Sequence, residues 1–285
     1  MSLIQAIIIA IVEGLTEFLP VSSTGHMILA QGIMGVKSDD FVKAFTIIIQ
    51  FAAILSVVCI YWKRFFKLNH TPAPDGSNSL QKFLYKWDFY WKLLVAFIPA
   101  AVIGFLAKKT GLIDRFLESV TIVAIMLVLG GIFMLFCDKI FNKGSEQTKL
   151  TEKRAFYIGL FQCIAMIPGV SRSMATIVGG MAQKLTRKNA AEFSFFLAVP
   201  TMAAATGLDL LELLLDENVT WATPSNIITL VVGCVVAFIV AILAIKGFVN
   251  FLTKYGFKAF GYYRIIVGGL ILILMLCGVE FSLVE

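Results

Sequence analysis

The residues of greatest chemical interest near the start of the chain are two glutamates, Glu13 and Glu17, four residues apart in an apolar stretch. On a helix this spacing places both carboxylates on one face. At membrane depth one carboxylate costs about 2.5–3.5 kcal/mol, and two neighbouring ones also repel each other. The pair therefore predicts a general base or a divalent-cation site, in which hard oxygen ligands favour Mg²⁺ or Ca²⁺. The alternative is a short helix near the interface, with both carboxylates in water.

Three hydroxyl side chains and a histidine follow this pair: Ser22, Ser23, Thr24 and His26. Unpaired N–H groups at the start of a helix favour an anion, so a helix that begins here predicts an anion site. The hydroxyls could equally cap that helix. A histidine titrates near neutral pH, which suits proton transfer or nucleophilic attack on phosphorus. A lone histidine is more often structural, but its place beside carboxylates and hydroxyls favours a functional role.

A second polar break holds Ser171, Arg172 and Ser173, just before another expected helix. Arg172 lies too far from either flanking loop to reach water easily, and its guanidinium matches phosphate oxygens bidentately. The alternative is an ion pair with Glu13 or Glu17, which would itself bring the two breaks together. Two helix N-termini, an arginine and a cation would then face one ligand. That ligand is predicted to be strongly anionic and to arrive from lipid.

The composition places these residues in a membrane protein. Of the 285 residues, 59% are hydrophobic and 15% are charged, and the mean hydropathy is +0.89. Soluble proteins carry about 25% charged residues, because their surface must face water. The sequence therefore predicts an all-α integral membrane protein and excludes an ordinary soluble enzyme. The net charge of +6 predicts basic cytoplasmic loops and no nucleic-acid partner, since no basic patch is interleaved with exposed aromatic residues.

Apolar stretches of about 20 residues can cross a bilayer core about 30 Å thick. Six stretches meet this length: 42–62, 89–107, 120–141, 192–214, 226–245 and 262–280. Two others, 3–35 and 155–182, are interrupted by the polar breaks. Irregular backbone at membrane depth is tolerated where it is buried in protein or lines a wet cavity. We therefore expect six transmembrane helices plus two re-entrant helix hairpins.

The two breaks are related in sequence. Glu13 precedes Ser22 by nine residues, and Gln162 precedes Ser171 by nine residues. A Gly-Gly pair also recurs in the last span of each half. The sequence therefore predicts two repeats, each with one hairpin and three spans.

The predicted repeats, 1–142 and 143–285, form one membrane domain. Three spans are an odd number, so the repeats have inverted topology, as in many transporters whose sites lie between broken helices. Placing the basic loops at 63–92 and 246–264 in the cytoplasm puts the acidic loop at 208–225 outside. Both termini then lie outside, the first hairpin enters from the outer face, and the second enters from the inner face.

Two segments carry a resemblance to a known family. Residues 13–26, Glu-Gly-Leu-Thr-Glu-Phe-Leu-Pro-Val-Ser-Ser-Thr-Gly-His, and residues 168–173, Pro-Gly-Val-Ser-Arg-Ser, closely resemble the two signatures of the bacterial undecaprenyl-pyrophosphate phosphatase family, also called the BacA family. The likeness extends to residues 192–200 and to the order of the spans. A long motif with a second one at the expected distance is a specific signal.

The resemblance implies a multi-pass enzyme of the bacterial cytoplasmic (inner) membrane whose substrate is a polyprenyl diphosphate lipid. It implies hydrolysis of undecaprenyl diphosphate to undecaprenyl phosphate and inorganic phosphate. This reaction recycles the lipid carrier of peptidoglycan synthesis and confers bacitracin resistance. The resemblance further implies a requirement for a divalent cation and an active site that opens to the extracytoplasmic side.

Carried over residue by residue, the resemblance marks three groups. The catalytic residues would be Glu17, Ser23, His26 and Arg172. The residues that bind the substrate phosphates would be Ser22, Thr24, Ser171, Arg172 and Ser173. Glu13 and Glu17 would hold the cation, Mg²⁺ or Ca²⁺. The nucleophile is Ser23, His26 or an activated water.

A secondary transporter or flippase of a polyprenyl phosphate or another anionic lipid is the alternative function, because inverted repeats and broken helices suit it too. A transporter has no need for a histidine and hydroxyls beside paired carboxylates. Phosphate release from a lipid diphosphate by the purified chain separates the two. Membrane phosphatases of the phosphatidic-acid type are excluded, since the chain has no Arg-Pro pair. Besides membrane lipid, a second copy in a homodimer is the partner that the sequence leaves open.

Overall fold

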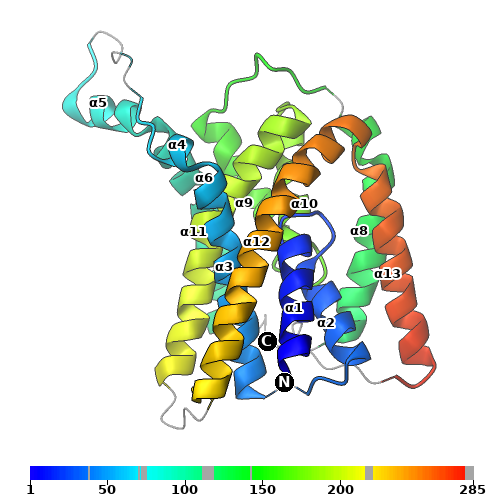
Figure 1. Cartoon of the computed structure of the whole chain (residues 1–285). Coiled ribbons are helices and arrows are strands. Elements are labelled where there is room, and N and C mark those ends of the chain that lie inside the picture. The colour runs from blue at the N-terminus through cyan, green and yellow to red at the C-terminus, as the bar shows by residue number, and fades with distance from the viewer. Residues whose placement is uncertain are drawn as a thin grey trace.

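The computed structural model describes residues 1–37, 39–69, 71, 76–110, 119–141, 143–215 and 221–279. Within these ranges all regular structure is helical. Six helices are long and apolar enough to cross a membrane: α3 (Asp40–Ile60), α6 (Asp88–Lys109), α8 (Val120–Ile140), α11 (Arg187–Leu215), α12 (Pro224–Tyr255) and α13 (Lys258–Leu276). The predicted all-α integral membrane protein with six long spans is confirmed (Figure 1).

Polar residues in the loops fix where several of these spans begin. Asp39 accepts a hydrogen bond from the N–H of Val42 at 2.8 Å, and Ser119 caps α8 with its hydroxyl. Each side chain satisfies an N–H group that has no partner inside its own helix. Thr223 caps α12, and Pro224 follows at the first helical position, where a missing N–H costs little. A short polar residue before an apolar run therefore sets each of these starts.

The two interrupted stretches each form a pair of short helices. The first pair is α1 (Leu3–Thr16) with α2 (Ser23–Ile33), and the second is α9 (Glu152–Ile164) with α10 (Arg172–Ala182). Both polar breaks lie between the helices of a pair, as predicted. The helices of each pair contact each other, and most residues of both breaks are buried. The breaks therefore place non-helical backbone in the interior of the bundle.

The predicted basic loop at 246–264 is wrong. α12 continues as a helix to Tyr255 and α13 begins at Lys258, so this segment is almost entirely helical. A helix of 32 residues is about 48 Å long, so α12 can carry its lysine-bearing last turns past a hydrocarbon core of about 30 Å. The lysines end the apolar run without ending the helix. Arg264, which the prediction placed in the loop, lies inside α13 and is fully buried.

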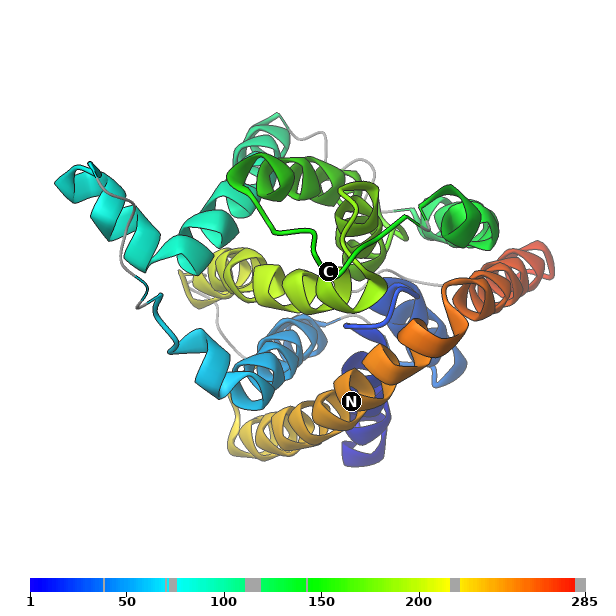
Figure 2. The ribbon, with the colours of Figure 1, turned by 90° about the horizontal axis from the view of Figure 1, so that it is seen from above.

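The other predicted loops also contain helical structure. The basic loop at 63–92 holds α5 (Ser79–Lys86) and most of α4 (Trp62–Phe65), which project from the bundle in Figures 1 and 2. The acidic loop at 208–225 begins within α11. Part of it, residues 216–220, lies outside the described residues.

The helices pack in pairs through small residues. α8 lies against α13, α1 against α12, α6 against α9 and α3 against α11, and Figure 2 shows α8 and α13 together at one edge. The recurring Gly-Gly pairs lie at the α8–α13 crossing, where Gly131 is close to the carbonyl of Gly261 and Gly268 is close to that of Ala124. Glycine permits this approach, which is how helices gain van der Waals contact in lipid.

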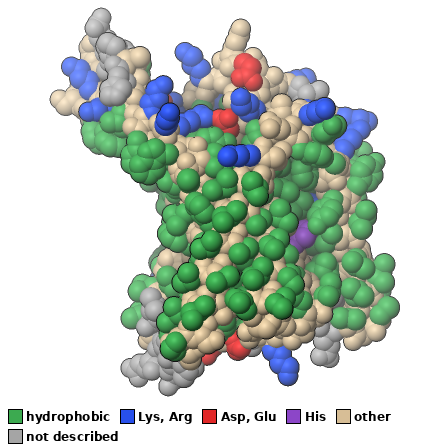
Figure 3. All heavy atoms as spheres, viewed as in Figure 1, with side chains coloured by type: hydrophobic (Ala, Val, Ile, Leu, Met, Phe, Trp, Pro, Cys, Tyr) green, Lys and Arg blue, Asp and Glu red, His purple; other side chains and the backbone are tan. Residues whose placement is uncertain are grey.

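Large apolar side chains cover the outer faces of the long helices, including Leu243, Ile266 and Leu276. Figure 3 shows them as a broad band, while Lys and Arg gather at the end that carries α4 and α5. Soluble proteins rarely expose apolar patches of this extent, because the patches would be in contact with water. The surface is therefore that of a multi-pass membrane protein.

We predict that Gly268→Ala destabilises the fold and that its neighbour Gly269→Ala does not. A Cβ on Gly268 would lie 2.8 Å from the carbonyl oxygen of Ala124, whereas one on Gly269 would meet nothing within 4 Å. Overpacking of this kind costs about 1–3 kcal/mol, so thermal unfolding in detergent should show a lower melting temperature for the first variant alone. Equal melting temperatures would contradict the α8–α13 crossing.

Candidate active site

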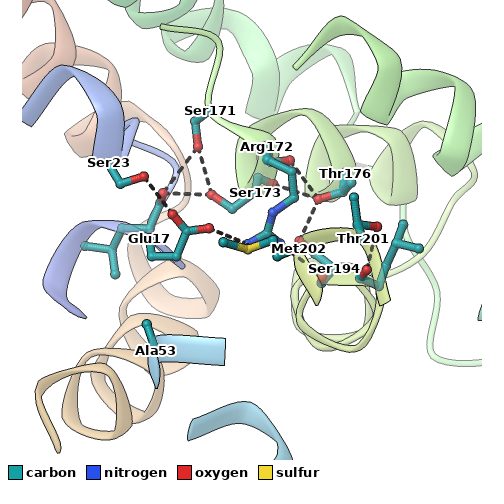
Figure 4. Close-up of polar contacts among 12 residues, drawn as sticks. Glu17, Ser23, Ala53, Ser171, Arg172, Ser173, Thr176, Ser194, Thr201 and Met202 are labelled. Carbon is teal, nitrogen blue, oxygen red and sulfur yellow. Dashed lines mark hydrogen bonds and ion pairs between the residues drawn. The ribbon is translucent and has the colours of Figure 1, made fainter. Parts of the chain in front are cut away.

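The two polar breaks meet through hydroxyl groups. Ser173 Oγ donates to the carbonyl oxygen of Leu19 at 2.7 Å, and Ser171 Oγ donates to the same oxygen at 3.3 Å. The two hydroxyls are 2.9 Å apart (Figure 4). Ser171 also caps α10, accepting from the N–H of Met174. Hydroxyls of the second break therefore provide hydrogen-bond donors for a backbone carbonyl of the first, so the two breaks are in direct contact.

Glu17 joins the two breaks by an ion pair. Arg172 Nη2 lies 2.9 Å from Glu17 Oε1, and Ser23 Oγ donates to Glu17 Oε2 at 2.6 Å. Figure 4 shows the carboxylate between these two groups. The ion pair expected as an alternative role for Arg172 is present, and its partner is Glu17. The carboxylate thus pairs with a guanidinium through one oxygen and accepts a hydroxyl hydrogen bond through the other.

The rest of the Arg172 guanidinium is held by α11 and the first break. Nη1 donates to the carbonyl of Ser194 at 3.3 Å, and Nη2 donates to the sulfur of Met202 at 3.4 Å. The guanidinium carbon lies 5.9 Å from the centre of the Phe18 ring. The buried Nε has no hydrogen-bond partner among the described residues. A fixed cation with an unused N–H is suited to a phosphate oxygen.

Glu13 is fully buried, and neither of its carboxylate oxygens has a hydrogen-bond partner in the described part of the chain. It lies one helical turn before Glu17 on α1. Buried polar atoms are nearly always partnered, so this carboxylate needs a ligand or a proton. Two carboxylates fit a hard divalent cation such as Mg²⁺ or Ca²⁺. Among the described residues no three His, Cys, Asp or Glu side chains cluster for a metal, so further ligands would be hydroxyls, carbonyls or water.

His26 is engaged at both ring nitrogens. Nδ1 lies 2.7 Å from the carbonyl oxygen of Ser22, and Nε2 lies 2.7 Å from the hydroxyl of Tyr263. A carbonyl only accepts, so Nδ1 carries a proton. The rings of His26 and Tyr263 stack with their centres 5.4 Å apart. His26 therefore ties the start of α2 to α13.

The remaining predicted site residues lie at the start of α2. Ser22 occupies the cap position, but its side chain makes no capping hydrogen bond. Its φ of 72° is in the left-handed region, which is unusual for a residue other than glycine. Thr24 is half-buried in the first turn. The capping role that the sequence offered as an alternative for the hydroxyls before α2 therefore fails for Ser22.

Arg264 belongs to this region and was missed from the sequence. Its five N–H donors all have acceptors: at 2.7–3.3 Å the carbonyl oxygens of Pro20, Met126, Leu127 and Gly169, and at 3.7 Å the sulfur of Met174. No carboxylate of the described chain pairs with it. Pro20 and Gly169 belong to different breaks, so one buried guanidinium binds the backbone of both.

One feature of the sequence could have indicated that Tyr263 and Arg264 lie inside a transmembrane helix. No proline or polar cluster separates Lys258 from the apolar run that follows. An arginine one helical turn after Gly261, and opposite the glycine pair of α8, has room to be buried, since the side chain of Arg264 fills the space beside Gly130. The prediction counted Arg264 as a charge of the basic loop at 246–264 and therefore overlooked that it could be buried against α8.

Comparisons with known proteins identify the family of the chain. The family model described as bacitracin resistance protein BacA matches residues 6–270. A protein of Porphyromonas gingivalis named undecaprenyl-diphosphatase is 58% identical over 99% of this chain and its own full length. Proteins of the same name from Flavobacterium psychrophilum and Bdellovibrio bacteriovorus are 55% and 49% identical, over 96% and 100% of both chains.

We predict that Arg264→Met strongly destabilises the chain. It removes the donor of the Pro20 and Gly169 carbonyls, which lie in the breaks and have no helical N–H to replace it, and each such loss costs about 1–3 kcal/mol. The expected drop in the free energy of unfolding is about 2–6 kcal/mol. Lys258→Met, at an exposed position on the same helix, is the matched control and should change stability by less than about 0.5 kcal/mol. Similar melting temperatures for both variants in detergent would refute the role given to Arg264.

Proposed function

The chain belongs to the bacitracin resistance protein BacA family, and we propose that it hydrolyses undecaprenyl diphosphate to undecaprenyl phosphate and inorganic phosphate. It thereby recycles a lipid carrier of peptidoglycan synthesis in the bacterial inner membrane and confers bacitracin resistance. The names of its relatives favour this reaction over transport. A secondary transporter or flippase is therefore not favoured, although broken helices suit one.

The observation that carries the proposal is the position of Glu17 between Ser23 and Arg172. A hydroxyl that donates to a carboxylate has its proton acceptor in place, which activates the oxygen as a nucleophile. A guanidinium on the other carboxylate oxygen provides the charge that a phosphoryl group requires. An acceptor, a hydroxyl and a fixed cation within one hydrogen-bonded group suit phosphoryl transfer better than simple anion binding.

In the proposed reaction, Ser23 Oγ attacks the terminal phosphorus. A bond forms from this oxygen to phosphorus while the bond from phosphorus to the bridging oxygen breaks, and undecaprenyl phosphate leaves. Glu17 accepts the Ser23 proton. Glu17 passes this proton to the departing undecaprenyl phosphate and is again a carboxylate. Water then attacks the phosphoserine and gives its proton to Glu17, while the bond from phosphorus to Ser23 Oγ breaks. Ser23 Oγ takes that proton back from Glu17 as inorganic phosphate leaves. The hydrogen bond of Ser23 favours it over His26, whose two nitrogens are already engaged.

The other polar groups bind the diphosphate. Arg172 offers its free Nε–H to a phosphate oxygen, and the hydroxyls of Ser22 and Thr24 and the N–H groups that begin α2 and α10 offer further donors. The hydroxyls of Ser171 and Ser173 donate to the Leu19 carbonyl in this structure and would turn to a phosphate oxygen when the diphosphate binds. Glu13 and Glu17 would hold a divalent cation, which would supply positive charge against the diphosphate. His26 orients the start of α2 through the Ser22 carbonyl and is the nearest candidate acid.

We further propose that residues 1–142 and 143–285 are repeats of inverted topology, with 3–35 and 155–182 as re-entrant hairpins. The packing supports this, because exchanging the halves converts the α1–α12 contact into α9–α6 and maps the α3–α11 and α8–α13 contacts onto themselves. The positive-inside rule places the α4–α5 end in the cytoplasm. The site then opens to the extracytoplasmic side.

Arg172→Lys tests the phosphate site. The lysine keeps the charge but loses the planar guanidinium, so one or two charge-assisted hydrogen bonds, about 1.5–3 kcal/mol each, are lost in the transition state. Phosphate release from undecaprenyl diphosphate should fall roughly ten- to ten-thousand-fold, with little change in melting temperature. Arg172→Ala should lower both. Near-normal turnover of the lysine variant would mean that Arg172 only joins the breaks.

Labelling tests the orientation. Gln81→Cys in α5 and Ala222→Cys before α12 both lie at exposed positions. In intact cells a membrane-impermeant thiol reagent should label Ala222→Cys and leave Gln81→Cys unlabelled until the membrane is opened, and the unsubstituted chain is the background control. Labelling of both in intact cells would overturn the proposed topology.

A further inference from the structure

α4 and α5 leave a row of large apolar side chains without protein cover. We call residues 62–69 and 76–87 the arm. In Figures 1 and 2 it extends sideways from the end of the bundle where α3 stops and α6 starts. Four of its apolar side chains are more than half exposed: Trp62, Phe66, Leu80 and Phe83. Their ring contacts are within the arm, between Trp62 and Phe66 and between Phe83 and Trp87.

The sequence of α5 is amphipathic. Leu80, Phe83 and Trp87 recur at helical spacing and form one apolar stripe. Lys82 and Lys86, four apart, lie on another face. An eight-residue helix is marginal by itself in water. The hydrogen bonds that hold it among the described residues are near its ends. Asn78 caps its start, and the N–H of Asn69 donates to the Lys86 carbonyl at 3.0 Å, beside two contacts of Tyr85 with Asn69 and Thr71. An apolar surface in contact with the stripe would therefore stabilise α5.

The arm is also strongly basic. Its residues include five Lys or Arg and no Asp or Glu. Arg64 is paired with Glu192 and lies over the Phe196 ring, so it ties the arm to α11. The four lysines are exposed and have no ion-pair partner among the described residues: Lys63, Lys67, Lys82 and Lys86. Two of them, Lys67 and Lys86, line a hollow between the arm and the start of α6.

The occupant that fits both properties is a membrane surface. The arm leaves α3 and enters α6, two spans of the bilayer, so lipid lies directly beside it. In Figure 3 apolar side chains gather on the underside of the arm, toward the apolar band, and Lys and Arg gather above them. Tryptophan is typical of the boundary between lipid and water, and lysine of contact with anionic lipid phosphates. A protein partner would not require apolar side chains on the bilayer side of the arm and basic side chains above them.

We propose that the arm is an interfacial anchor for anionic phospholipid. The stripe of Leu80, Phe83 and Trp87 lies at the boundary of the acyl chains, and the lysines contact phosphate groups, with the hollow beside Lys67 and Lys86 holding a headgroup. This binding surface is separate from the proposed active site and does not depend on phosphatase activity. It is a structural role for a segment that the sequence analysis treated only as a basic loop.

A fluorescent probe on the full chain tests the anchor. An environment-sensitive dye is attached to Phe83→Cys, on the stripe, or to Gln81→Cys, off it, in a chain whose native cysteines are replaced by alanine. The chain is reconstituted in vesicles of phosphatidylcholine alone or with phosphatidylglycerol. We expect a blue-shifted and brighter emission at position 83 with phosphatidylglycerol, and emission typical of water at position 81.

Lysine variants complete the test. Lys82→Gln with Lys86→Gln should remove most of the shift at position 83, while Lys149→Gln with Lys153→Gln, exposed outside the arm, should leave it. Emission typical of water at position 83 in anionic vesicles would overturn the proposal. An equal shift in phosphatidylcholine alone would overturn the preference for anionic lipid. A shift that is already present in detergent and grows with protein concentration would assign the stripe to a second copy.

Discussion

Backbone groups that leave a helix inside a membrane have no water to bind, and the arrangement of this protein follows from that constraint. The two breaks expose carbonyl groups in the centre of the bundle. Arg264 donates to one carbonyl from each break and to two from α8, using four of its five N–H donors. The hydroxyls of Ser171 and Ser173 satisfy the carbonyl of Leu19. The breaks are therefore stable only together, and this brings the side chains of Glu17 and Arg172, 155 residues apart in sequence, into hydrogen-bond contact.

The proposed chemistry depends on the same contact between the two breaks. Once the breaks are joined, Glu17 from one and Arg172 from the other form an ion pair, and Ser23 reaches the free oxygen of that carboxylate. Each of these groups would be costly alone at this depth. Together they leave one buried carboxylate, Glu13, and one N–H of Arg172 without partners. We assign the first of these unpaired groups to a cation and the second to a phosphate oxygen.

Much of this was predictable from the sequence. Apolar length gave the six long spans, and the interruptions at Pro20 and Pro168 gave the positions of both breaks. The ion pair of Arg172 with a glutamate, which the sequence offered as the alternative to a phosphate contact, is present. Tyr263 and Arg264 were missed as site residues although the predicted span 262–280 contains both. Arg264 was also counted with the lysines at the end of α12 as loop charge, but a helix can extend beyond the bilayer. The partner of Arg172 could not be chosen between Glu13 and Glu17, because that depends on how α1 rotates against α10. The acceptors of Arg264 are backbone carbonyls, which no residue type reveals.

The central claim is that the meeting point of the two breaks is where the lipid diphosphate is cleaved. The most direct test is phosphate release from undecaprenyl diphosphate by the purified Glu17→Gln variant, with Glu152→Gln, an exposed carboxylate on α9, as the matched control. Glutamine keeps the shape of the side chain but cannot accept the Ser23 proton or carry the charge that Arg172 pairs with. The account predicts a fall in turnover of about a hundred- to ten-thousand-fold for Glu17→Gln and no change for Glu152→Gln. Turnover of Glu17→Gln within a few-fold of the unsubstituted chain would contradict it.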